Sequence, residues 1–551
     1  MTNVEKKWLI LDTLVILILG IISTVVPFTE HFFNVSLDGI YHFARFQQIA
    51  DSLRIGEIPE VLNFKYVPGN SVPGVAINSA YPWIIGLIFI IPNIIFHNPI
   101  WGLALGFLIL NVITIISIKQ LLSYISNNIW AIYSGVIIYQ FNNYHFIDLY
   151  SRVAIGESLA YAFLPLVVLG LLKINKNDKR GFITLGLAMA LIINSHVLTF
   201  VFALCIVIVY GLYLFAYKLI FRKQNVLQIC LNITKAGILG IILGGYSVYN
   251  IAYIYVHNSI VGPPKGISPL DANTTLASIL NNSISEHIFY GWNFGLPITS
   301  MIVILGIWSL FGKTKNYKKI FITTMLFYSI LFAWIPFNLL KDSPLGTVQF
   351  LGRFLIIVIL MFSIGICLFV SNQTLRKDAL IIINMSIILF SVFALFNNHN
   401  EFGEKNAGHV KINSNNYYKI LETNVTFAEF LPKEYLGPRK EILEDKKIVK
   451  IKNSKYNNNS VTYIIDSKEN KNIIIPVVLY KGFNYELNNN GRVKVIKSTH
   501  MIKTSVKKGE NHIIVKSINN KHKYMLLISL LGLFIICINI CWYKISYLLY
   551  K

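Results

Sequence analysis

Apolar runs about as long as a lipid bilayer is thick recur along this chain, and they constrain its fold more than any other feature. A helix that crosses the hydrocarbon core needs about 20 consecutive apolar residues. Of the 551 residues, 54% are hydrophobic and only 14% are charged, and the mean hydropathy is +0.57. These values predict a polytopic α-helical membrane protein and argue against an ordinary soluble enzyme.

The positive charges give the chain an orientation. The formal net charge is +23, but Lys and Arg lie mainly in short loops and in one polar C-terminal block. The positive-inside rule explains this distribution, so no nucleic-acid partner is expected. Lys6 and Lys7 place the N-terminus in the cytoplasm. The same rule keeps four basic stretches inside: Lys173 to Arg180, Arg222-Lys223, Lys313 to Lys319 and Arg376-Lys377.

One apolar segment does not fit a simple count of crossings. Four such segments lie between the first outer stretch and the basic run that begins at Lys173, and four crossings would leave that run outside. The segment from Trp83 to Phe96 is short and contains Pro92. We therefore expect it to be an interfacial or re-entrant helix within the first outer loop, residues 29–100.

The other apolar segments predict about twelve spans in the cell membrane, with both termini in the cytoplasm. The run from Phe182 to Tyr217 is expected to form two helices joined by a tight outer turn at Asn194 to His196. The remaining spans are expected at Trp8–Phe28, Trp101–Ile118, Trp130–Tyr144, Leu159–Leu172, Val226–Ile254, Pro297–Phe311, Ile320–Leu340, Phe354–Val370, Ala379–Phe396 and Tyr524–Tyr543.

The polar block before the last span has a different periodicity. Its second half contains alternating runs typical of strands, separated by Asn, Gly, Lys and Glu clusters: VTYIID, NIIIPVVLY, GRVKVIK, MIKTSVKK and HIIVKS. Their lengths and turn residues predict a small antiparallel β-sandwich. We expect a transmembrane domain over residues 1–396, a mainly β extracytoplasmic domain over 397–523, and a last transmembrane helix with a cytoplasmic tail over 524–551.

Ionisable residues gather in the predicted outer loops and define a candidate site. Asp38, His42 and Arg45 stand at i, i+4 and i+7 in DGIYHFAR, so they share one helical face. Ionisable residues that face a cavity at a membrane are functional candidates. We expect Asp38 to be catalytic, and the expected substrate-binding residues are His42, Arg45, Arg152, Glu157, His196 and Arg353.

Each position also has a purely structural interpretation. Asp38 could be the N-cap of a helix. Glu157 could lie at a helix N-terminus, where the helix dipole favours a negative charge, and Arg353 could extend to lipid headgroups. Together, however, a carboxylate, a histidine and two arginines on one side of the membrane predict a site that binds an anionic group and deprotonates an acceptor. Arginine suits phosphate because its planar fork forms bidentate hydrogen bonds, and aspartate can accept a hydroxyl proton.

Several segments carry a family resemblance. DGIYHFARFQQIADSLRIGEIPE, followed by Tyr81-Pro82, resembles the first outer loop of bacterial GT-C-type integral membrane glycosyltransferases, especially the YfhO-like proteins and the membrane proteins labelled 6-pyruvoyl-tetrahydropterin synthase-related. SRVAIGESLAYAFLPLVVLGL, NSHVLTF and QFLGRF are similar to further landmarks of these proteins. The stretch from IIIPVVLYKGFNYELNNNGRVKVIK to KKGENHIIVKS resembles their outer β-sandwich. No pterin chemistry is expected.

The resemblance implies transfer of a sugar from a polyprenyl-phosphate donor to a cell-envelope acceptor, a polymer or a lipid, at the outer membrane face. It implies that Asp38 is the base or a metal contact, and that Arg353 and Arg152 hold the donor phosphate. His42 and Glu157 would shape the acceptor side. No cofactor is expected, and a divalent metal is unsupported because no second acidic residue with ligand spacing accompanies Asp38.

Two other functions fit part of the sequence. A transporter or flippase for an anionic lipid or polymer would use the same arginines to line a path, but it would need ionisable residues deep in several helices. Asp12 is the clearest of these, and it is expected close to the inner surface. A non-catalytic envelope-assembly protein would display the β domain outside and would not need the loop residues.

Overall fold

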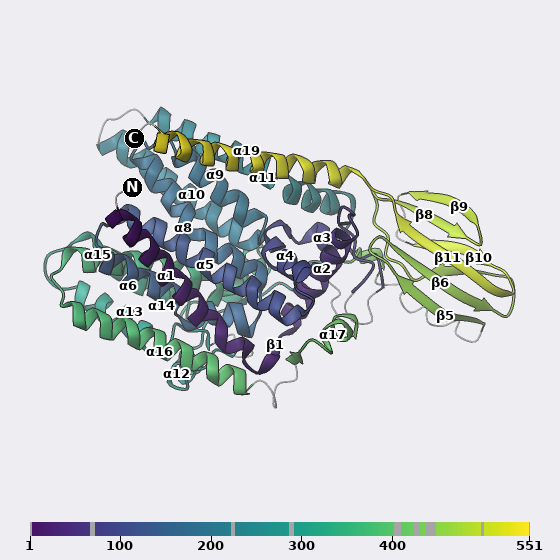
Figure 1. Ribbon diagram of the computed structural model, residues 1–551, viewed down its shortest axis with the longest axis horizontal. Coiled ribbons are helices and arrows are strands. Elements are labelled where there is room, and N and C mark those ends of the chain that lie inside the picture. Colours follow the sequence, from purple (N-terminus) through teal and green to yellow (C-terminus); the bar gives the residue numbers. More distant parts are fainter. Residues whose placement is uncertain are drawn as a thin grey trace.

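The computed structural model describes residues 3–66, 72–221, 226–285, 291–401, 409–423, 430–435, 448–497 and 501–549. The protein is mostly helical, and a C-terminal β-sheet region lies at one end of the helical body (Figure 1). The predicted inner pair Arg222-Lys223 and parts of the predicted domain 397–523 fall outside the described residues.

Seven helices in the described part of the chain are long and apolar enough to cross a membrane. Each overlaps one of the predicted spans. They are formed around α1 (Asn3–Val25), α5 (Pro99–Ile125), α8 (Ile155–Asn175), α10 (Val197–Ala216), α11 (Leu227–His257), α15 (Leu355–Asn372) and α16 (Lys377–Glu401).

Other predicted spans form shorter helices, and the last one forms α19 (Lys521–Leu549). The predicted span Ile320–Leu340 is wrong at its C-terminal end, because the helix there stops at Ile330. Beyond Ile330 the backbone pairs with Leu270 in place of the next helical turn: the Leu270 N–H donates to the Leu331 carbonyl at 2.9 Å, and the Ala333 N–H donates to the Leu270 carbonyl at 3.1 Å. The shorter helices are α6 (Ile129–Gln140), α9 (Gly181–Ile193), α13 (Leu296–Ser309) and α14 (Asn316–Ile330).

The first outer loop folds into short elements beside the long helices. The segment from Trp83 to Phe96 contains only a 3₁₀ turn and a helix of nine residues, as expected for a segment that does not span. The turn predicted at Asn194 to His196 separates α9 from α10. The elements of the loop are β1 (Phe33–Val35), α2 (Leu37–Arg54), α3 (Ile77–Ala80), η2 (Ile84–Gly86) and α4 (Leu87–Ile95).

The β region contains two antiparallel sheets, one of five strands in the order β5-β6-β11-β8-β9 and one formed by β7 and β10. The predicted strand NIIIPVVLY ends early, at Ile475, because Pro476 has no N–H for strand pairing. Strand β5, which is rich in Lys, and strand β8, which is rich in Asn, were not predicted. The strands are β5 (Val449–Tyr456), β6 (Ser460–Ser467), β7 (Lys471–Ile475), β8 (Asn484–Asn489), β9 (Arg492–Lys497), β10 (Ile502–Val506) and β11 (Gly509–Ser517).

The first outer loop is also tied to the β region. The hydroxyl of Tyr480, a fully buried residue, accepts a hydrogen bond from the Ala76 N–H at 3.0 Å and donates one to the Phe430 carbonyl at 2.8 Å. Lys523 Nζ lies 3.0 Å from the buried Glu60 carboxylate. At the opposite end of the helical body, the beginning of α1 and the end of α19 lie close to the same side (Figure 1).

We expect Tyr480→Phe to destabilise this junction by about 2 kcal/mol, because it leaves a buried N–H and a buried carbonyl without their partner. The matched control is Tyr456→Phe, since Tyr456 is exposed on an edge strand. The melting temperature of the purified protein in detergent should fall for the first variant only. Equal melting temperatures would contradict the junction.

Candidate functional site

A cavity of about 690 Å³ lies where the predicted first outer loop meets several other segments of the chain. Apolar and aromatic side chains supply most of its wall, and a few ionisable groups converge on it, which is the usual make-up of a ligand site. The cavity brings together six of the seven residues that the sequence singled out: Asp38, His42, Arg152, Glu157, His196 and Arg353.

Arg45 is the exception, because it lies behind the cavity wall and is fully buried. Its Nε donates to His42 Nδ1 at 3.2 Å, and its Nη1 donates to the carbonyls of Tyr81 at 3.3 Å and Pro82 at 3.0 Å. Its Nε and Nη1 donors are used within the protein, so Arg45 helps to position His42 and the loop beside it. Its predicted role in substrate binding stays a prediction.

The start of α2 explains how Asp38 reaches the cavity. Ser36, not Asp38, caps this helix by accepting the N–H of Gly39 at 3.1 Å, and the Ser36 hydroxyl also donates to the Arg152 carbonyl. A side chain at Gly39 would collide with Val153, so glycine lets the helix start approach that segment. The N-cap interpretation of Asp38 is therefore wrong, and its carboxylate is left for the cavity.

The Asp38 side chain is exposed to the cavity. It makes no hydrogen bond and no ion pair with any residue that the structure describes, although Arg152 and Arg353 are near enough to act on its charge. The protein around this carboxyl group disfavours its charged form. It raises the pKa of Asp38 above its usual value of 3.8, and the two arginines oppose the rise only in part.

Glu157 has the opposite situation, because both of its carboxylate oxygens are occupied. Oε2 lies 3.1 Å from Arg152 Nη1 and 3.4 Å from Arg353 Nε. Oε1 accepts a hydrogen bond from the Tyr144 hydroxyl at 3.2 Å. Glu157 is buried, and a buried charge of this kind is tolerated only when it is paired. It therefore holds two arginines in place and is poorly suited to take up a proton.

Arg152 is fixed on all sides. Its Nη1 also lies 2.7 Å from Asp148 Oδ1, and its guanidinium carbon lies 4.8 Å from the centre of the Trp292 ring. Burial alone would lower the pKa of Arg152, but the carboxylates of Glu157 and Asp148 hold it above the usual value. Arg152 is thus a permanent cation that is largely neutralised by the protein.

Arg353 is held by the segment before it. Its Nη1 donates to the Val348 carbonyl and to Gln349 Oε1, both at 3.0 Å. Gln349 has a φ of +63°, and Val153, next to Arg152, has a φ of +52°. Such backbone is costly for side chains other than glycine, at about 1–3 kcal/mol each, and is concentrated at functional sites. The strain accompanies both arginines of the cavity.

Two histidines add neutral donors. His42 Nδ1 accepts from Arg45, and His196 Nδ1 accepts the N–H of Thr199 at 3.4 Å. Burial, followed by the charge of Arg45, lowers the pKa of His42 well below its usual value, and burial lowers the pKa of His196 to about 4. Both rings are therefore neutral at physiological pH, with the proton on Nε2.

Glycines let two aromatic rings form the cavity wall. A Cβ on Gly156 would lie 2.5 Å from the Tyr81 hydroxyl oxygen, and one on Gly352 would lie 2.6 Å from the Trp292 ring. Both rings line the cavity. The glycines of the Gly-Glu and Leu-Gly-Arg motifs thus allow close packing of the wall on either side of the arginines.

Sequence reasoning missed several residues of this site. Asp148 could have been found, because it precedes Arg152 by four residues, the spacing of an ion pair on a helix. Tyr144 and Trp292 carry no local signal, since they become neighbours of Glu157 and Arg152 only through the tertiary fold. Within the described part of the chain, no group of three or more His, Cys, Asp or Glu side chains could hold a metal ion.

No protein-family model and no curated protein match the sequence. The resemblance to GT-C-type glycosyltransferases therefore stays a prediction that depends on its motifs. The geometry of the cavity is the basis for its proposed chemistry.

We expect Gly156→Ala to destabilise the protein by about 1–3 kcal/mol, because the added methyl would displace Tyr81 and press on the Ser195 carbonyl, 2.9 Å away. Gly237→Ala is the control, since a Cβ at Gly237 of α11 has no neighbour within 4 Å. Thermal unfolding monitored by intrinsic fluorescence would compare them. Equal stability of the two variants would show that Tyr81 is not packed on Gly156.

Proposed function

We propose that this protein is a GT-C-type membrane glycosyltransferase that moves a sugar from a polyprenyl-phosphate donor to a polymer or lipid of the cell envelope. The observation that carries the proposal is one unpaired carboxylate, Asp38, in a cavity with two arginines and two neutral histidines. The arrangement supplies a base, cationic groups and neutral hydrogen-bond donors at one place, as the reaction requires.

The proposed placement is a multi-pass protein of the cell membrane with about twelve spans and cytoplasmic termini. The seven long apolar helices support membrane insertion. The beginning of α1 and the end of α19 lie on the side of the helical body opposite the β region, which supports a β domain and a cavity on the outer face.

In the proposed reaction, Asp38 accepts the proton of an acceptor hydroxyl. The acceptor oxygen then bonds to the anomeric carbon of the donor as the bond from that carbon to the phosphate oxygen breaks. The electron pair of the broken bond leaves with polyprenyl phosphate, which gains one negative charge. Attack from the face opposite the leaving group inverts the anomeric configuration.

The leaving phosphate is the group that needs positive charge. Arg353 is the better candidate to receive it, because it is paired with one carboxylate, Glu157, whereas Arg152 is paired with two, Asp148 and Glu157. The Nε2–H groups of His42 and His196 can donate to phosphate oxygens without adding charge. Preorganised donors of this kind stabilise charge that develops in the transition state, since they do not have to reorient.

Asp38 is preferred to Glu157 as the base for two reasons. The oxygens of Glu157 are occupied by Arg152, Arg353 and Tyr144, whereas Asp38 has no described partner. The raised pKa of Asp38 also makes its carboxylate a stronger base than an ordinary aspartate.

We expect Asp38→Asn to lower transfer by about 10²- to 10⁴-fold, because the amide cannot accept the proton. The test uses purified protein in nanodiscs with a radiolabelled polyprenyl-phosphate sugar and follows donor consumption. In the wild type, the rate should fall as the pH is lowered through the pKa of Asp38, which lies above 3.8, because protonation removes the base. Asp342→Asn, an exposed change of the same chemistry, is the control and should keep the wild-type rate and pH profile.

Three outcomes would overturn the proposal. Full activity of Asp38→Asn would remove this residue from the reaction. Movement of intact donor between leaflets without loss of its sugar would indicate a flippase. Normal cell-envelope function of a variant with alanine at Asp38, Arg152 and Arg353 would indicate a non-catalytic assembly protein.

A further inference from the structure

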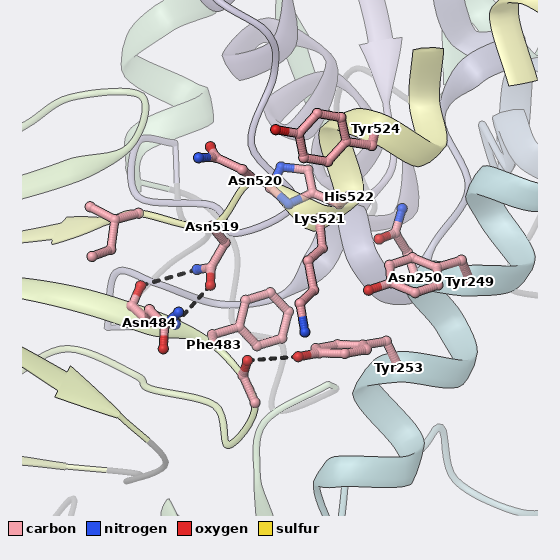
Figure 2. Close-up of a pocket in the computed structure, with 12 residues that line it drawn as sticks. Tyr249, Asn250, Tyr253, Phe483, Asn484, Asn519, Asn520, Lys521, His522 and Tyr524 are labelled. Carbon is pink, nitrogen blue, oxygen red and sulfur yellow. Dashed lines mark hydrogen bonds between the residues drawn. The ribbon is translucent and has the colours of Figure 1, made fainter. Parts of the chain in front are cut away.

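A second pocket, of about 270 Å³, lies at the junction of α11, the β region and the start of α19 (Figure 2). It is separate from the large cavity, and the two flank the same end of α11. Ile251 and Tyr255 of this helix line the large cavity, whereas Asn250 and Tyr253 line the second pocket. Its volume is close to the lower end of the range for ligand pockets, about 300 Å³.

Aromatic rings form one part of its wall. The rings of Tyr249 and Tyr253 lie 5.4 Å apart, and Phe483 meets Tyr253 edge-on at 5.5 Å. The Tyr253 hydroxyl donates to the Gly482 carbonyl at 2.7 Å, so this ring is fixed in place. Rigid aromatic faces of this kind pack well against the C–H groups of a sugar ring.

Amide side chains form another part. Figure 2 shows Asn250 beside Tyr249, and Asn484 and Asn519 across the pocket. Asn519 is used to hold the loop, since its Oδ1 accepts the Asn484 N–H at 2.7 Å. Asn250 is buried, and its Nδ2 makes no hydrogen bond of normal geometry with the described residues. The nearby Tyr246 hydroxyl contacts the Asn250 side chain but already accepts from Trp83 Nε1.

Few charged side chains line the pocket. Its described lining contains no carboxylate, and Lys521 is its one lysine. Glu60 lies nearby but is paired with Lys523 at 3.0 Å, outside the lining. A ligand that carries hydroxyl groups and either no charge or a negative charge is therefore favoured over a cationic one.

We propose that this pocket binds a single sugar ring, neutral or anionic. Tyrosines at a membrane surface often belong to an aromatic belt, but a belt requires neither a concave wall nor converging amide groups. Both are present here, together with neighbouring aromatic rings, one of which, Tyr253, is fixed by a hydrogen bond. The binding does not depend on the proposed transfer reaction in the large cavity.

The test titrates the full-length protein in nanodiscs with methyl glucoside, glucuronate and glucosamine, and follows binding by saturation-transfer NMR. Methyl glucoside and glucuronate should bind, and glucosamine should bind least. Tyr249→Ala should weaken binding of the first two by about tenfold, because it removes one stacking surface. Tyr213→Ala removes an exposed tyrosine elsewhere and should bind as the wild type does.

Three further variants separate the possible outcomes. Asn484→Ala should also weaken binding, since it removes an amide while its backbone hydrogen bonds remain. Lys521→Ala should abolish the preference for glucuronate over glucosamine. Asp38→Asn should bind these sugars normally even if transfer is lost. Absence of sugar binding by the wild type, or equal binding by Tyr249→Ala, would overturn the proposal.

Discussion

The ion pairs of Glu157 with Arg152 and Arg353 are the interaction on which the site depends. A buried carboxylate between two guanidinium groups fixes segments that are almost two hundred residues apart in the chain. Removing one partner from such a network leaves uncompensated charge and costs about 3–5 kcal/mol. Asp148 and Tyr144 complete the network, so the N-terminal end of α8 is held by charge as well as by packing.

This network decides which acid can act in the cavity. Because Glu157 is the counter-ion of both arginines, Asp38 faces the cavity without a partner among the described residues. Its neighbours affect it only through space, and burial dominates over their attraction, so its pKa is raised. The cavity therefore contains two carboxylates with different roles, one that organises cations and one that is available to a substrate. Their different environments alone produce the difference.

Much of this arrangement could be predicted from the sequence. Apolar length and positive charge located the long helices and the turn at His196, and charge at the predicted outer ends selected six residues that line one cavity. The sequence could not predict whether a given side chain reaches the cavity or lies behind its wall. Arg45 shares a helical face with Asp38, but its long side chain turns toward His42 and the carbonyl groups behind the wall.

The features that escaped prediction depend on contacts distant in sequence or on weak local patterns. Trp292 packs on Arg152 from a different loop, and no periodicity indicates such a contact. Strands β5 and β8 contain only a short apolar alternation among Lys and Asn residues, Val449 and Ile451 in β5 and Tyr485 and Leu487 in β8, so the pattern that identifies a strand is weak there. The strained backbone at Val153 could not be predicted either, since valine strongly disfavours the positive φ that it adopts there.

The central claim is that Asp38 is an unpaired, protonatable carboxyl group in a low-dielectric cavity and that Glu157 is not. A hydrophobic carbodiimide modifies protonated carboxyl groups in apolar surroundings, and peptide mass spectrometry locates the modified residue. We expect Asp38 to be modified, and faster as the pH is lowered, whereas Glu157 should stay unmodified because both of its oxygens are occupied. Modification of Glu157 in place of Asp38 would contradict it.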